Sequence, residues 1–113
     1  MIYIAIAVLS LTAILGLYLL SLLLRNKSTP KGVTIIHGLM AAAALILIII
    51  YSFVNKPSPW ESVIALVIAA LGGFMLNYRD ITGKSVPKWL GIGHGLVAIT
   101  GFALLIYFAF FCQ

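Results

Sequence analysis

The chain has 113 residues, of which 64% are hydrophobic and only 8% charged, and its formal net charge is +5. Soluble globular domains carry about a quarter charged residues, so this composition excludes an ordinary water-soluble domain. The basic residues are spread over the connecting segments rather than gathered on one surface, so the positive charge does not indicate a nucleic-acid partner. The first partner that we expect is the lipid bilayer.

Four apolar runs predict the secondary structure. They cover Ile2–Leu24, Val33–Val54, Trp60–Tyr78 and Trp89–Phe111. A run of about 18 or more apolar residues is long enough to cross the hydrocarbon core as a helix. The expected fold class is therefore an all-α membrane protein with four transmembrane helices and no soluble domain.

The connecting segments differ in charge, and this difference predicts the topology. The segments after the first and third runs hold most of the basic residues (Arg25, Lys27 and Lys31; Arg79, Lys84 and Lys88). The middle segment holds only Lys56. Because basic loops stay on the cytoplasmic side, we expect the first and third loops in the cytoplasm and both termini outside. The expected location is a bacterial inner membrane, with the protein as a multi-pass component.

A repeat relates the two halves of the chain. Residues 27–41 align without gaps on residues 84–98, and nine of the fifteen positions are identical. The offset of 57 residues is about half the chain length, which predicts a tandem duplication into residues 1–57 and 58–113 within one integrated membrane domain. Two spans return the chain to its starting side, so we expect parallel hairpin repeats related by a pseudo-twofold axis along the membrane normal.

The repeat contains the only two histidines, His37 and His94, each six residues beyond a lysine. Six helical residues span about 9 Å, so both imidazoles are expected inside the bilayer near the cytoplasmic face. Ionisable side chains inside the bilayer are rare and commonly functional, so we treat both histidines as candidate site residues. Zinc and copper sites require three or four ligands, and no carboxylate or thiol lies at this depth. Haem iron needs only two axial ligands, so we expect haem b between the second and fourth helices.

The neighbours of the histidines suit a planar macrocycle. Small residues provide space beside them: Gly38, Ala41, Gly91, Gly95 and Ala98. Basic residues at the near end could pair with the haem propionates: Lys31, Lys88, Arg25 and Arg79.

These features resemble the membrane b-type cytochromes, which are four-helix bundles with haem held by histidines from different helices. The resemblance rests on the four spans, on His37 and His94, and on the small residues around them. It implies electron transfer. The chain departs from the two-haem members, which need four ligands, so the resemblance implies one haem near the cytoplasmic face that exchanges electrons with quinone or a small oxidant.

Two other interpretations stay open. The histidines could be structural hydrogen-bonding residues in an anchor or assembly subunit of a larger respiratory complex, and they could pair within one chain or across a homodimer. The third interpretation is a small transporter that resembles the small multidrug resistance proteins, which depend on an acidic residue in the first helix; Ile2–Leu24 contains none. Small residues in the first and third runs, including Gly16 and Gly73, are interpreted as helix-packing residues.

Overall fold

The computed structural model describes residues 1–112, with side chains up to Phe111. The helices are α1 (Ile2–Leu24), α2 (Lys31–Val54), α3 (Trp60–Ile81) and α4 (Lys88–Tyr107), followed by the π-helical turn η1 (Phe108–Cys112). All four α-helices are long and apolar enough to cross a membrane, which confirms an all-helical fold with four helices of membrane-spanning length. Helix α3 continues three residues beyond the predicted Tyr78, because hydropathy marks the apolar run and not the polar turn that prolongs it.

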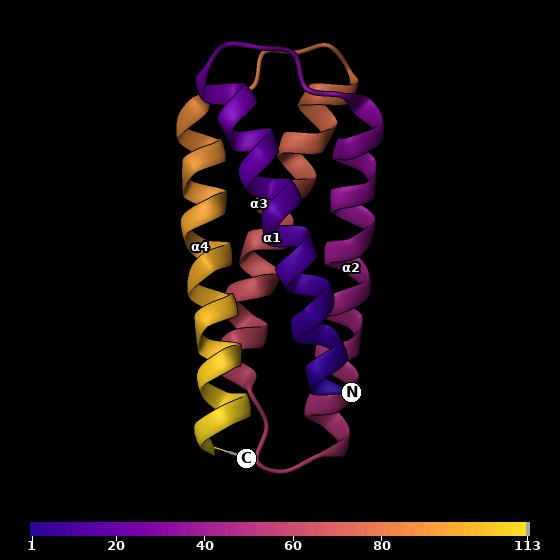
Figure 1. Cartoon of the computed structure of the whole chain (residues 1–113), viewed down its shortest axis with the longest axis vertical. Coiled ribbons are helices and arrows are strands. Elements are labelled where there is room, and N and C mark those ends of the chain that lie inside the picture. The colour runs from indigo at the N-terminus through magenta and orange to yellow at the C-terminus, as the bar shows by residue number, and fades with distance from the viewer. Residues whose placement is uncertain (113) are drawn as a thin grey trace.

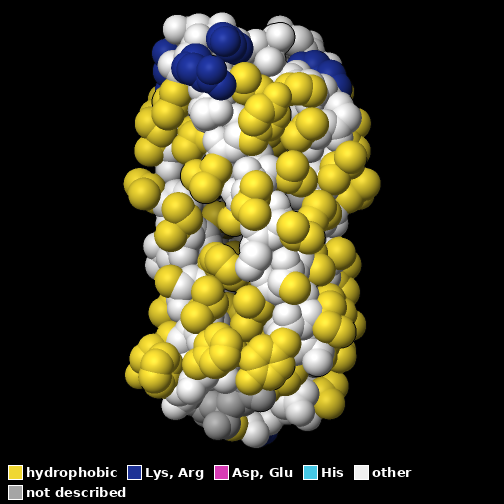
Figure 2. All heavy atoms as spheres, viewed as in Figure 1, with side chains coloured by type: hydrophobic (Ala, Val, Ile, Leu, Met, Phe, Trp, Pro, Cys, Tyr) yellow, Lys and Arg dark blue, Asp and Glu magenta, His cyan; other side chains and the backbone are white. Residues whose placement is uncertain are grey.

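The helices form an elongated bundle of 43 × 20 × 19 Å. Helices α1 and α3 each pack against both α2 and α4, so α1 lies diagonally opposite α3, and α2 lies diagonally opposite α4 (Figure 1). The loops 25–30 and 82–87 lie at one end, and the termini and the middle loop lie at the other (Figure 1). Lysine and arginine side chains gather at the first of these ends (Figure 2), which we call the basic end; the opposite one is the terminal end.

The two loops at the basic end have the same backbone form. Helices α1 and α3 are each followed by a residue in the left-handed region, Asn26 with φ 57° and Gly83 with φ 76°. The next amide then donates to a carbonyl of the last helical turn at 2.9 Å in both loops, from Lys27 to Leu22 and from Lys84 to Arg79. This hydrogen bond is that of the Schellman motif, which favours glycine or asparagine in the left-handed position. Extended prolines, Pro30 and Pro87, then precede α2 and α4.

The tightly packed core occupies the terminal half of the bundle. Its buried members come from all four helices and η1: Ile2, Ala5, Leu9, Ala44, Ile48, Tyr51, Val63, Leu66, Leu105, Phe108 and Ala109. In α3 and α4, the buried Ser62 hydroxyl donates to the Gly101 carbonyl oxygen at 2.7 Å. Both histidines lie in the other half of the bundle, next to the basic loops, where they line a cavity.

Candidate cofactor site

Each histidine is held by the helix that precedes it in its own hairpin. The Nδ1 atom of His37 lies 2.9 Å from the carbonyl oxygen of Thr12 in α1, and the Nδ1 atom of His94 lies 2.7 Å from that of Ala69 in α3. A carbonyl oxygen only accepts hydrogen bonds, so Nδ1 is the protonated nitrogen in both rings. In a neutral imidazole the lone pair is then on Nε2.

Two glycines allow the rings to approach the backbone so closely. A Cβ atom at Gly16 would lie 2.9 Å from Cε1 of His37, and a Cβ atom at Gly73 would lie 2.9 Å from Cε1 of His94. Such a separation is shorter than real Cβ contacts, so a side chain at either position would displace the ring. The sequence interpretation treated both glycines as packing residues; the structure places them in the histidine site. Their common offset of 57 residues, the same as between the histidines, was the available signal.

The structure brings the two imidazoles together inside one chain. Their ring centroids are 6.4 Å apart and their planes are nearly perpendicular, at 86°. Between residues 1 and 112 no hydrogen bond reaches Nε2 of either ring, and no fully enclosed side-chain nitrogen or oxygen lacks a partner. The two Nε2 atoms therefore keep accessible surface.

Both histidines line a partly open cavity of about 1120 Å³ to which all four helices contribute. Cavities that bind small molecules commonly measure about 300–1,000 Å³, so this one is large enough for a cofactor. Most of its wall is apolar, and at one end the cavity is lined by loop residues of the basic end, which we call its mouth. Six of the residues predicted for the site line it besides the histidines: Gly38, Ala41, Gly91, Gly95, Ala98 and Lys31. In the described part of the chain, no group of three or more histidine, cysteine or acidic residues forms a metal site.

Two of the predicted glycines serve helix packing as well as lining the cavity. A Cβ atom at Gly91 would lie 2.6 Å from Cδ2 of Leu23, and one at Gly38 would lie 2.8 Å from Nδ2 of Asn77. Side chains from α1 and α3 therefore already fill the space beside these glycines. Gly95 is less crowded, since its nearest neighbour of this kind is Leu20 at 3.9 Å.

Of the four basic residues predicted for the site, only Lys31 lines the cavity. Lys31 forms an ion pair with Asp80 at 2.8 Å. The other three predicted cations, Arg25, Arg79 and Lys88, are not among the residues that line the cavity. Arg25 donates to the Ser21 carbonyl oxygen, and Arg79 donates to that of Ser85. Lys27, which the sequence interpretation did not assign to the site, does line the cavity.

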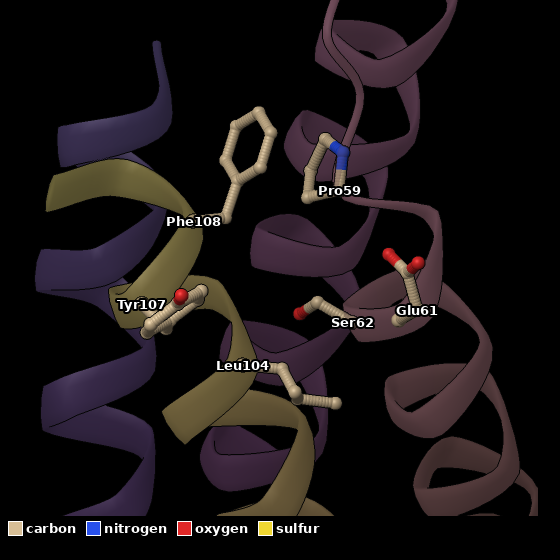
Figure 3. A pocket seen from close by; sticks show the side chains of 6 residues that line it. All are labelled: Pro59, Glu61, Ser62, Leu104, Tyr107 and Phe108. Atoms are coloured by element: carbon tan, nitrogen blue, oxygen red, sulfur yellow. The ribbon is translucent and has the colours of Figure 1, made fainter. Parts of the chain in front are cut away.

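A second, smaller cavity of about 310 Å³ lies at the terminal end. Its lining comes from the start of α3 and the end of the chain's last helical segment: Pro59, Glu61, Ser62, Leu104, Tyr107 and Phe108 (Figure 3). The Ser62 hydroxyl is already bonded to Gly101, and no histidine is present. This cavity therefore lacks the groups that distinguish the larger one.

No family model, no curated protein and no solved structure matches the chain. Its function has to be argued from the histidine site.

Proposed function

We propose that the protein is an integral membrane protein that holds one haem b between His37 and His94 and transfers electrons. The ring separation is the observation that supports this most. Metal–nitrogen bonds of about 2.0 Å, with about 1.2 Å from each nitrogen to its ring centre, would let two imidazoles share one metal ion at a separation of ring centres up to about 6.4 Å. The observed separation of the centroids is 6.4 Å.

The hydrogen bonds to the two rings also suit metal ligands. A metal-bound histidine almost always donates its other N–H to a carboxylate, a carbonyl or water, and this partner fixes both tautomer and orientation. Thr12 and Ala69 provide such carbonyl oxygens for His37 and His94. The chain would thus hold both rings ready before any iron is bound, with Nε2 as the ligand atom on each.

With His37 and His94 both serving as ligands, a bound haem would have no coordination position left for oxygen or substrate, and it would supply one-electron transfer. This favours electron transfer over oxygen activation. The residues of the chain would fix the two ligands and surround the site mostly with apolar side chains. The electron partner that we propose is a quinone or a small oxidant that reaches the haem edge.

We further propose that the two hairpins, residues 1–57 and 58–113, arose by tandem duplication and lie in a bacterial inner membrane with the basic end in the cytoplasm. The 57-residue offset relates the histidines, the glycines that contact them and the left-handed loop residues. Large apolar side chains are exposed along all four helices, and surfaces of this kind are rare on soluble monomers. The position of the basic loops agrees with the positive-inside rule.

The runner-up is a structural histidine pair in an anchor subunit of a larger complex. The hydrogen bonds to Thr12 and Ala69 would suit this role equally. The large cavity and the unpaired Nε2 atoms favour the haem-binding role, because a purely structural imidazole in an apolar setting would be expected to bond through both nitrogens.

Asparagine substitution separates the two roles. In His37→Asn and His94→Asn the amide Nδ2 keeps a donor close to the position of Nδ1, so the bond to the carbonyl can form, but the iron ligand is lost. We expect wild-type protein from haem-replete cells to show a Soret band and sharp α and β bands on reduction, and each variant to lose them while its thermal stability stays near that of the wild type. Ile36→Ala, on an exposed face of α2, is the control and should keep the bands.

Colourless wild-type protein after haem supplementation would contradict the proposal and leave the structural role. Loss of the bands in only one of the two variants would show that the second ligand is another group.

A further inference from the structure

The cavity mouth at the basic end has an uneven distribution of charge. Its charged lining residues are Lys27, Lys31 and Asp80. The Asp80 carboxylate accepts hydrogen bonds from the Thr29 hydroxyl at 2.8 Å, from the Lys31 ammonium at 2.8 Å and from the Thr34 hydroxyl at 3.3 Å. We call these four side chains the Asp80 network. Because Lys31 and Asp80 neutralise each other, the mouth keeps one uncompensated positive charge, on Lys27.

The other basic residues of this end are engaged elsewhere or lie off the cavity. Arg25 and Arg79 donate to loop and helix carbonyls, and the Lys84 ammonium lies over the Tyr78 ring, 5.3 Å from its centroid. Lys88 is not among the lining residues. No ion pair or side-chain hydrogen bond of Lys27 occurs within the described residues.

Comparison of residues 57 positions apart shows that the two hairpins differ at this end of the cavity. The positions that correspond to Thr29, Thr34 and Asp80 are occupied by Val86, Gly91 and Leu23. At the corresponding place, Leu23 packs into the space beside Gly91, so the polar network occurs only once. Lys27 and Lys84 also correspond to each other, yet only Lys27 lines the cavity.

We propose that Lys27 is the residue that binds an anionic group of the ligand, and that the ligand of this cavity is therefore a planar apolar molecule with a carboxylate at the end that faces the loops. This inference rests on the proposed haem site and names the group that orients the haem in it. A carboxylate at the mouth gains a charge-assisted hydrogen bond from the Lys27 ammonium group, which is exposed and therefore available to a ligand. The histidines lie about 9 Å deeper along their helices than Lys31 and Lys88, and the flexible lysine stem can extend toward the bundle interior.

Two porphyrins and two matched variants test the proposal. Purified wild type, Lys27→Gln and Lys84→Gln are stripped of haem and titrated in the same detergent with ferric protoporphyrin IX and with its dimethyl ester, in which both carboxylates are neutral. We expect Lys27→Gln to weaken binding of the free acid about fivefold, the upper value for an exposed ion pair, and to leave binding of the ester within about twofold of the wild type. Lys84→Gln should leave both affinities unchanged.

Equal affinity of wild type and Lys27→Gln for the free acid would overturn the role of Lys27 while leaving the haem site intact. An equal loss for both porphyrins would also overturn it, because that result indicates a change in the cavity rather than in charge recognition. A wild-type protein that binds neither porphyrin would overturn the proposed function itself.

Discussion

The histidine site depends at the residue scale on two missing side chains. His37 and His94 reach the carbonyl oxygens of Thr12 and Ala69 only because Gly16 and Gly73 leave the ring faces room one turn further along. Glycine in a helix interior lowers helix stability by about 1 kcal/mol relative to alanine. These two glycines therefore weaken their helices but allow the rings to reach the carbonyl oxygens.

Alanine at these glycines should therefore stabilise the helix but damage the site. We expect Gly16→Ala and Gly73→Ala each to weaken haem binding about tenfold or more, since overpacking of a filled site costs about 1–3 kcal/mol and the displaced ring can no longer place Nε2 correctly. The measurement is a Soret titration of the haem-free protein. Gly93→Ala is the matched control, because a Cβ atom there meets nothing within 4 Å.

Wild-type affinity in both glycine variants would show that the rings do not need these contacts, and it would remove the glycines from the site.

At the residue scale the sequence predicted the histidine pair better than its surroundings. The two histidines are conspicuous because they are the only ones and they share a repeat. Their hydrogen-bond acceptors are the backbone carbonyls of Thr12 and Ala69. Because every residue has a backbone carbonyl, the amino-acid sequence does not indicate which ones accept. The assignment of Lys31 to an anionic ligand overlooked Asp80, which is 49 positions away and meets it only after the hairpins have packed.

At the scale of helices, hydropathy located all four helices of membrane-spanning length, because long uninterrupted apolar runs are rare in other contexts. It could not indicate how the hairpins join. At the basic end they are linked by the Asp80 network, which ties the start of α2 to the end of α3. The corresponding contact of α1 with α4 is the apolar packing of Leu23 beside Gly91.

Removal of the Asp80 charge should loosen the α2–α3 contact. We expect Asp80→Asn to lower the free energy of unfolding by about 1–2 kcal/mol, mainly from the hydrogen bonds that the carboxylate accepts. The ion pair itself should add little, because the Lys31 side chain is 55% exposed. Thermal or denaturant unfolding in detergent measures the change. Glu61→Gln is the control at the terminal end, where this exposed carboxylate forms no ion pair among the residues described.

Unchanged stability of Asp80→Asn, or an equal loss in Glu61→Gln, would mean that the network does not hold the hairpins together.

At the scale of the whole molecule, the two ends of the bundle have different tasks. The buried core lies in the terminal half, and the cavity runs from the edge of this core, at Leu9 and Leu66, past the histidines to the loops of the basic end. A rigid half can hold the helices at a fixed spacing while the other half leaves space for a ligand. The sequence predicted the basic loops on one side but not this division, because burial depends on which helix faces meet.

The arrangement of basic loops leads to a topology prediction. Alkaline phosphatase fused to the C-terminus should be active in bacteria, because we expect that end outside. The same reporter inserted in the loop 25–30 should be inactive. The reverse pattern of activity would place the histidine site near the outer face and contradict the proposed orientation.

We propose that two imidazoles of one chain, those of His37 and His94, bind one iron. Low-temperature electron paramagnetic resonance of the ferric, haem-loaded protein tests it most directly. We expect a single low-spin species whose signal is strongly anisotropic, because the ring planes stand at 86° to each other, and we expect it to vanish in both His37→Asn and His94→Asn. A high-spin signal in the wild type, or a low-spin signal that survives both substitutions, would contradict the account.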